Sequence, residues 1–292
     1  MVISIGRSFM QEKIKIRTKD GRMICATCYY PLKPNGKNII VAPAAVANVT
    51  QREYRSFAVF FQQLGYNVFT FDYRGVGDSA PSHLKGCDAR LQQWAVQDAD
   101  AVIRYVKTSF PAMELIYVGH GIGGELIGLA QASQYINKLV LVSSSLSCKR
   151  LWSWKGRMRI TFLKAVGSVS NRLLGYFPGK RLGFPRDLPK GVMHEWSDWC
   201  NKPNGIFDVF PDNNYRKLTI PLFAFSFSND WMTPEKGVEG LLSYFSNANI
   251  TRYHDHPHNQ GLVNGQQICF FDLQLKDTLW IKLEQWINEE LA

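Results

Sequence analysis

The chain has 292 residues, of which 46% are hydrophobic and 20% are charged, and its net charge is +10. This composition excludes an intrinsically disordered chain, and the length suits one α/β core with an inserted subdomain. No run of 18 apolar residues occurs, so we expect neither a membrane-spanning helix nor a signal peptide. The six scattered cysteines do not form a disulfide framework, which favours a cytoplasmic protein.

Apolar runs alternate with amphipathic stretches, which predicts a mostly parallel eight-stranded sheet with helices on both faces. In chain order we expect a hairpin of residues 13–17 and 24–30, a strand at 38–42, a helix at 54–64, a strand at 67–71, a helix at 91–110, a strand at 115–118, a helix at 123–132 and a strand at 139–142.

The alternation stops after residue 146 and resumes with a strand at 222–227, a helix at 234–245, a strand at 250–253 and a final helix that reaches Glu290. The interruption predicts a basic, Trp-rich helical cap at residues 147–218, inserted into a core of residues 1–146 and 219–292. A cap helix is expected over residues 157–174, with Ile160, Leu163, Val166 and Leu173 on its apolar side.

Residues 119–123, Gly-His-Gly-Ile-Gly, have the spacing of a nucleophile elbow in which glycine stands where serine is usual. Gly121 has no hydroxyl group, so no acyl-enzyme can form there. An elbow residue normally occupies a backbone conformation that costs about 1 to 3 kcal/mol, and glycine adopts it freely. An oxyanion hole needs only backbone N–H groups, and we expect those of Ile122 and Ala44 to supply it.

Three further segments are specific: residues 71–77 (FDYRGVG), 173–179 (LLGYFPG) and 196–200 (WSDWC). With the order of the elements, they make the chain similar to the α/β-hydrolase superfamily, and in particular to a bacterial family of predicted hydrolases. The resemblance covers nearly the whole chain and implies an α/β-hydrolase fold. Members usually carry Gly-His-Ser-x-Gly-Gly at the elbow, an acid after the strand beyond the cap, and a histidine just before paired phenylalanines.

The resemblance assigns the acid position to Asp230, although an Asp there equally suits a cap for the helix that Pro234 opens. It assigns the histidine position to Gln267, which precedes Phe270 and Phe271 and cannot take up a proton near neutral pH. Two necessary residues are thus replaced together, which favours natural loss of the triad over an engineered Ser→Gly change. A histidine shortly upstream is the alternative base: His254, His256 or His258.

Aromatic residues of the cap are candidates to line a ligand pocket above the elbow, together with His120: Trp152, Trp154, Tyr176, Trp196 and Trp199. Their other interpretation is that they bury the cap against the core. By the resemblance, His120 is a packing or hydrogen-bonding residue and not a base.

Residues 149–190 contain eleven basic residues and one acid, Asp187, which accounts for the net charge of the whole chain. This run suits an acidic carrier protein, a coenzyme A thioester or an anionic membrane face, with nucleic acid the least expected partner. Its other interpretation is a solvated basic surface. We expect no cofactor and no metal ion.

Three functions follow from these residues. The first is a non-hydrolytic pseudoenzyme that binds a small apolar or acyl ligand under the cap. The second is a repurposed enzyme, a lyase, cyclase or isomerase, that uses the oxyanion hole and Asp230. The third is an esterase or thioesterase seen as a Ser→Gly inactivated form, or one with an unrecognised serine among Ser79, Ser143, Ser144 and Ser145.

Overall fold

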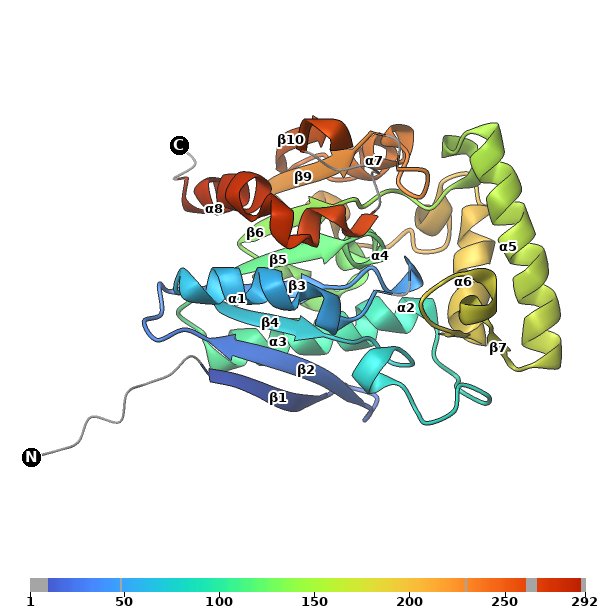
Figure 1. The fold of residues 1–292 in the computed structure, drawn as a ribbon, viewed down its shortest axis with the longest axis horizontal. Coiled ribbons are helices and arrows are strands. Elements are labelled where there is room, and N and C mark those ends of the chain that lie inside the picture. Colours follow the sequence, from blue (N-terminus) through green and yellow to red (C-terminus); the bar gives the residue numbers. More distant parts are fainter. Residues whose placement is uncertain (1–9, 48, 229, 261–266, 290–292) are drawn as a thin grey trace, which may run out of the picture.

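The computed structural model describes residues 10–47, 49–228, 230–260 and 267–289, and one eight-stranded sheet lies at its centre (Figure 1). From edge to edge the strands are β1 (Met10–Arg17), β2 (Met23–Tyr30), β4 (Asn67–Phe71), β3 (Lys37–Ala42), β5 (Glu114–His120), β6 (Lys138–Val142), β9 (Pro221–Phe227) and β10 (Asn249–Asp255). Strand β2 pairs antiparallel with β1 and β4, and the other pairings are parallel. The mostly parallel sheet expected from the sequence is confirmed.

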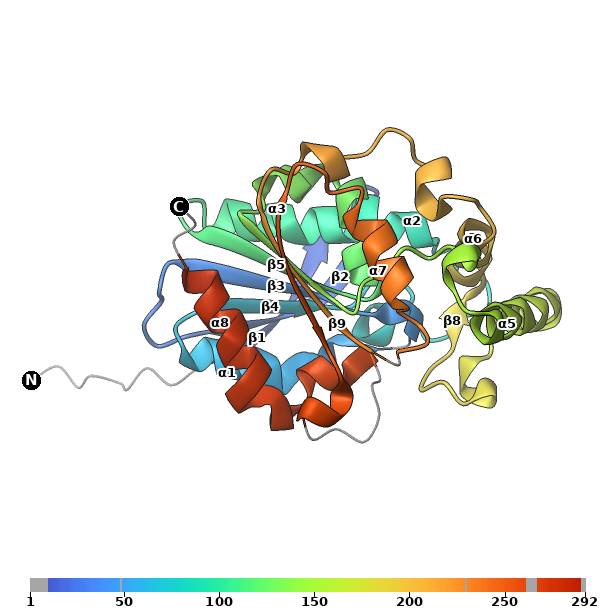
Figure 2. The same cartoon turned by 90° about the horizontal axis from the view of Figure 1, so that it is seen from above.

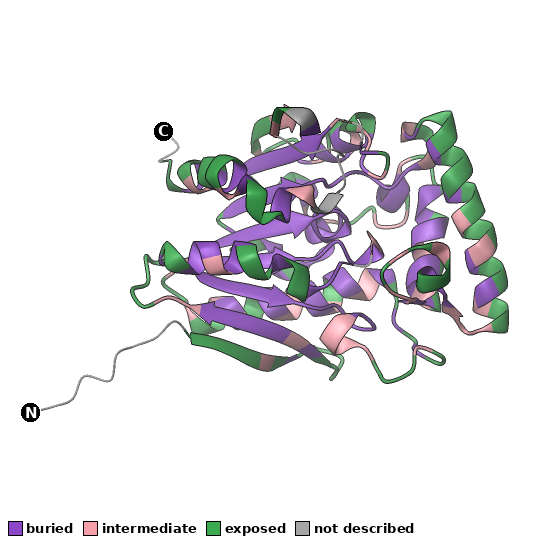
Figure 3. Ribbon diagram, viewed as in Figure 1, coloured by how far each residue is buried: buried purple, intermediate pink, exposed green. Residues whose placement is uncertain are grey.

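The described part of the chain contains eight α-helices: α1 (Arg55–Gln63), α2 (Leu91–Gln93), α3 (Asp100–Ser109), α4 (Ile122–Glu125), α5 (Trp154–Leu173), α6 (Lys190–Cys200), α7 (Glu235–Leu242) and α8 (Ile281–Asn288). Helices α1 and α8 cover one face of the sheet and α3 covers the other (Figure 2). Strands β4 and β6 are buried at every position, as expected of strands with helices on both sides (Figure 3).

The helix expected at residues 91–110 is present, although six of its residues, Trp94–Ala99, form a π-helical turn. The helix expected at residues 123–132 is not continuous. Helix α4 ends at Glu125, and two 3₁₀ turns follow, Ile127–Leu129 and Gln131–Tyr135.

Residues at the end of the inserted segment explain this break. The Tyr215 hydroxyl donates to the carbonyl of Glu125, which in a continuous α-helix would accept the N–H of Leu129. The Leu129 N–H turns instead to the carbonyl of Leu126, at 2.9 Å. The Asn214 N–H donates to the Gly128 carbonyl at 2.8 Å. Residues of the inserted segment thus satisfy two carbonyl groups that a continuous helix would have paired internally.

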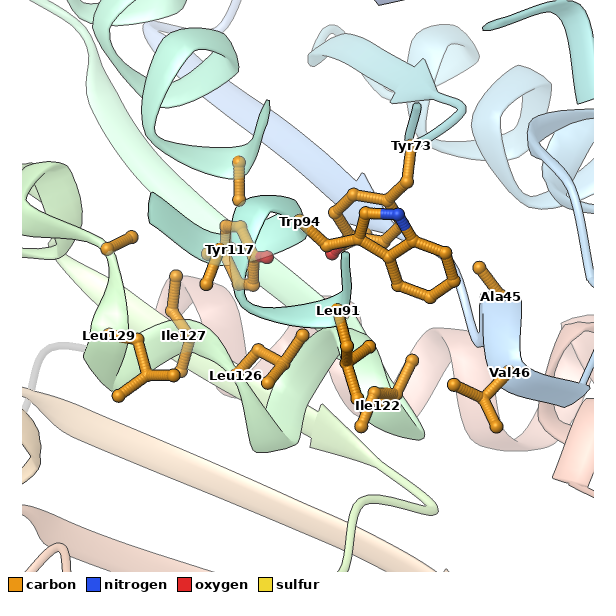
Figure 4. Packing of buried hydrophobic residues seen from close by; sticks show 14 of the residues in the cluster. Ala45, Val46, Tyr73, Leu91, Trp94, Tyr117, Ile122, Leu126, Ile127 and Leu129 are labelled. Carbon is orange, nitrogen blue, oxygen red and sulfur yellow. The ribbon is translucent and has the colours of Figure 1, made fainter. Parts of the chain in front are cut away.

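The loop after β4 connects separate parts of the fold through its side chains. The Arg74 guanidinium bonds to both Asp98, in the π-helical turn, and Asp20, in the β1–β2 turn. Tyr73 and Trp94 stack with ring centroids 4.9 Å apart, beside the side chains of the elbow helix (Figure 4). Residues 71–77 therefore tie the hairpin and the helical layer to the centre of the sheet.

The chain leaves the sheet after β6 and returns at β9, and the intervening residues lie beyond the carboxyl ends of the strands (Figure 1). We call residues 147–218 the inserted segment. It carries α5, α6 and a two-stranded sheet of β7 (Tyr176–Phe177) and β8 (Leu188–Pro189). Within the described residues, no helix combines the length and apolar character needed to cross a membrane.

The prediction for the apolar side of α5 is wrong at one residue, Leu173. Ile160 is buried, and Leu163 and Val166 are half-buried, but Leu173 is strongly exposed. The residues that pack inward are Gly156, Ile160, Gly167 and Ser170, mostly small side chains that let α5 approach its neighbours closely.

Candidate functional site

The elbow lies where β5 meets α4, at the carboxyl edge of the sheet. Gly121 has φ 53° and ψ −120°, a region that side chains of L-residues enter only with strain. A Cβ atom at Gly119 would lie 2.4 Å from Gly124 Cα, and one at Gly123 would lie 2.5 Å from the Ala42 carbonyl oxygen. The flanking glycines are therefore needed for the tight turn, as the motif predicts.

A small cavity of about 30 Å³ opens beside Gly121. Among the residues proposed from the sequence, it is lined by Gly121, Ile122, Ala44, Trp152 and Trp196, which come from four separate segments of the chain. Its volume is that of about one water molecule in the liquid. Of the six residues proposed for the ligand pocket, the structure therefore places two, Trp152 and Trp196, at the cavity beside the elbow.

Three aromatic residues proposed for this pocket lie elsewhere. Trp154 points to solvent from the first turn of α5. Tyr176 lines a different, open groove of about 920 Å³, between the inserted segment and the loop after β4. Trp199 is buried edge-on against Phe210, with ring centroids 5.5 Å apart. Phe210 also belongs to the inserted segment, so this contact lies within the segment, and Trp199 does not line the elbow cavity.

His120 is fully buried at the end of β5, and its Nδ1 lies 2.7 Å from the Tyr54 hydroxyl. That hydroxyl accepts the N–H of Ala44 at 3.0 Å. The predicted oxyanion donor at Ala44 is therefore directed at Tyr54 and not at the cavity. The His120 ring packs against Tyr54 and Phe271, and it is not among the residues that line the cavity.

Asp230 lies in the loop after β9 and is buried. One of its carboxylate oxygens accepts the Met232 N–H at 2.9 Å and the Thr233 N–H at 3.3 Å, and the other accepts the Thr233 hydroxyl. Burial raises the pKa of Asp230, although these hydrogen bonds oppose the shift. The carboxylate closes the turn before α7, but the N-cap residue of this helix is Pro234 and no side chain caps it, so Asp230 does not cap α7 directly. Its assignment to the acid position stays a prediction.

A buried carboxyl group that the sequence pattern did not single out also lines the cavity. Glu125 ends α4, and its two oxygens accept the N–H and the hydroxyl of Ser147, each at 2.6 Å. The Ser147 hydroxyl in turn accepts Trp196 Nε1 at 3.3 Å. Burial raises the pKa of Glu125 to about 7 against the effect of the two hydrogen bonds. The sequence offered one sign that Glu125 is buried: it is a single acid directly before the apolar residues 126–130.

Comparisons with known proteins agree with this geometry. A family model described as "Serine aminopeptidase, S33" matches residues 47–182. An esterase of Pyrococcus furiosus is 15% identical, with a TM-score of 0.66 over 100% of this chain and 97% of that one. The chain has the α/β-hydrolase fold. No curated protein matches it significantly.

Two bacterial enzymes share this α/β-hydrolase fold at similar distance. A thermostable carboxyl esterase of Bacillus coagulans is 13% identical, with a TM-score of 0.66 over 96% of this chain and 99% of that one. An esterase of Exiguobacterium antarcticum is also 13% identical, with a TM-score of 0.62 over 95% and 100% of the two chains. The resemblance to the α/β-hydrolase superfamily is thus confirmed at the level of the fold.

The histidine position of the fold falls at the edge of the described residues. Gln267 begins a 3₁₀ turn, Gln267–Phe271, and its side chain lies outside the described part of the structure, as does that of His258. His254 Nδ1, in the edge strand β10, lies 2.8 Å from the Ser226 hydroxyl in the neighbouring strand β9. The assignment of Gln267 to the histidine position stays a prediction, as does a substitute role for His254, His256 or His258.

The alternative serines do not form a nucleophile–base pair within the described residues. The Ser144 hydroxyl donates to the carbonyl of Gly119, and that of Ser79 to the carbonyl of Asp72. Ser143 has φ 44°, and its buried hydroxyl has no hydrogen-bond partner in the described part of the chain. Ser145 lines the cavity without a basic residue among the other lining side chains.

Proposed function

We propose that this α/β-hydrolase-fold protein binds a small apolar or acyl ligand at the elbow and does not hydrolyse it. The observation that carries the proposal is Gly121, which holds the backbone conformation of a nucleophile without a nucleophilic atom. Asp230 supports it, because its carboxylate is engaged by its own loop. The mostly apolar lining beside the elbow supports an apolar ligand. The polar residues of the lining are Glu125, Ser145, Ser147 and Thr233.

The cavity sets a condition on this function. Ligand sites usually measure about 300 to 1,000 Å³, whereas the elbow cavity measures about 30 Å³. Trp152 and Trp196 close it from the inserted segment. Binding therefore requires these two indoles to move outward, and the hydrogen bonds of Trp152 Nε1 to the Trp231 carbonyl and of Trp196 Nε1 to Ser147 must open.

The test compares the unmodified chain, Gly121→Ser, and Gly121→Ser with Gln267→His on short- and medium-chain acyl esters and thioesters. Gly121→Ala is the matched control, because it adds the Cβ atom without the hydroxyl. We expect no turnover by the unmodified chain and saturable calorimetric binding of octanoate, recovered unchanged. Ester hydrolysis by the unmodified chain, with an acyl-enzyme detected by intact mass, would overturn the proposal. Activity of the double variant alone would establish Gln267 as the histidine position.

A second candidate function is acid–base chemistry without a covalent intermediate, as in a lyase, cyclase or isomerase. Glu125 favours it, since a buried carboxyl group with a pKa of about 7 exchanges protons readily near neutral pH. Asp230 is less suited to that role because its own loop engages its carboxylate. Consumption of a bound ligand that Glu125→Gln abolishes and Asp230→Asn leaves intact would favour this function over simple binding.

A further inference from the structure

Helix α5 carries an unusual row of exposed apolar side chains. Five large residues are each between 60% and 77% exposed: Trp154, Met158, Phe162, Val169 and Leu173. Their spacings of four, four, seven and four residues place them on one stripe along the helix. The stripe runs the whole length of α5, about 30 Å for twenty residues. We call these five residues the α5 stripe.

The α5 stripe faces away from the rest of the protein. The buried residues of the helix, Gly156, Ile160, Gly167 and Ser170, lie on its other side, where α5 packs against α6 and β7. Helix α5 is also the outermost element at its end of the molecule in two perpendicular views (Figures 1 and 2). Isolated apolar residues on a surface are ordinary, but a continuous row of this length marks a contact surface.

Cations flank the stripe. Helix α5 contains five basic residues and no acid: Lys155, Arg157, Arg159, Lys164 and Arg172. In the part of the chain that the structure describes, none of the five forms an ion pair. Arg157 donates to the Trp152 and Arg150 carbonyls, and Lys155 and Arg159 lie over the rings of Trp154 and Trp231. Their charges are therefore not neutralised within the protein.

We propose that α5 docks this protein onto an anionic lipid surface, with the α5 stripe in the headgroup region and the five cations against the lipid phosphates. An amphipathic helix with Trp, Phe and Leu on one side and Lys and Arg beside them lies in the plane of such a surface. A second copy of the chain is disfavoured as the occupant, because a symmetric contact would bring two helices of five uncompensated cations together. This docking is independent of what the elbow cavity binds.

The experiment measures co-sedimentation of the full chain with vesicles of phosphatidylcholine alone or with 30% phosphatidylserine. We expect binding to the anionic vesicles, at least about tenfold weaker binding to the neutral ones, and release in 0.5 M salt. Met158→Ser with Phe162→Ser is expected to weaken anionic binding about tenfold or more. Lys155→Glu with Lys164→Glu is expected to weaken it by at least about fivefold per residue.

Matched variants elsewhere on the surface separate a specific face from general stickiness. Leu273→Ser removes a comparably exposed apolar side chain, and Lys19→Glu with Lys33→Glu makes the same change of charge. Both should bind nearly as the unmodified chain. Absence of binding to anionic vesicles would overturn the proposal, as would equal losses in the α5 and control variants. A concentration-dependent dimer that Met158→Ser with Phe162→Ser dissociates would assign the stripe to a second copy instead.

Discussion

At Gly121 the missing side chain changes stability as well as chemistry. The residue sits at φ 53° and ψ −120°, where a Cβ atom introduces strain. We predict that Gly121→Ser and Gly121→Ala each lower the free energy of unfolding by about 1 to 3 kcal/mol, measured by urea denaturation. A serine variant as stable as the unmodified chain would show that the elbow relaxes, and the strain argument would fail.

Glu125 makes the stability depend on pH. Its pKa of about 7 in the folded protein exceeds its ordinary 4.5, so the folded state holds the proton more tightly than the unfolded one. The stabilisation that the raised pKa of Glu125 gives the folded state is therefore complete below pH 4.5 and is lost as the pH rises to 7. At 1.36 kcal/mol per pH unit, the loss is about 3 kcal/mol.

Glu125→Gln isolates this effect, because glutamine keeps the shape and can still bond to Ser147 without a charge. We predict that the difference in unfolding free energy between the two proteins grows in favour of the variant from pH 5 to pH 8. Subtracting the two pH profiles of unfolding free energy removes the contributions of the other titrating groups, such as Asp98, because both proteins share them. Parallel profiles would mean that Glu125 keeps an ordinary pKa.

At the scale of elements, α4 shows tertiary contacts overriding a local pattern. Residues 123–132 are mostly apolar, and their pattern does not indicate that two of their carbonyl groups accept hydrogen bonds from Tyr215 and Asn214. A Cβ atom at Gly128 would lie 2.2 Å from the ring of Tyr215, so the glycine makes room for this partner. The hydroxyl that breaks the helix comes from a residue 90 positions away in the sequence, outside any local window.

Tyr215→Phe tests this attachment. The variant keeps the buried ring and removes the hydroxyl that caps α4, leaving the Glu125 carbonyl without that donor. We predict a loss of about 1 to 3 kcal/mol in urea unfolding. Tyr135→Phe, which removes a hydroxyl from a half-exposed ring, should change stability by less than about 0.5 kcal/mol. Equal values for the two variants would contradict the capping role.

The strands were the predictable part of this fold. Their apolar runs are bounded by glycine or polar residues, and β4 occupies the expected residues 67–71. The elbow was predictable for a related reason, because the glycines that allow its tight turn stand within five consecutive residues, 119–123. The packing of the inserted segment was not predictable. Trp154 and Trp196 are the same residue type, yet Trp154 faces solvent and Trp196 lines the cavity. Their difference depends on packing between segments distant in sequence.

At the scale of the whole molecule, Arg74 joins parts that the sheet alone does not. Its side chain is almost fully buried, 2.7 Å from Asp98, and also pairs with Asp20 at 2.6 Å. We predict that Arg74→Met destabilises the protein by about 3 to 5 kcal/mol at neutral pH, because Asp98 is left buried without its cation. Thermal and urea unfolding would measure this.

The exposed pair of Arg104 with Asp100, at the same distance of 2.7 Å, is the matched control. Arg104→Met should cost less than about 1 kcal/mol, since water already screens that pair. Similar losses of unfolding free energy in Arg74→Met and Arg104→Met would show that burial of the Arg74 ion pair does not increase the cost of breaking it.

The position of the basic run gives the molecule a large electric dipole. Residues 149–190 hold the equivalent of the whole net charge, and they lie at one end, beyond the carboxyl ends of the strands (Figure 1). In the field of an anionic surface such a molecule experiences a torque as well as an attraction. It turns before contact, so that the end carrying α5 arrives first and the elbow faces the same surface.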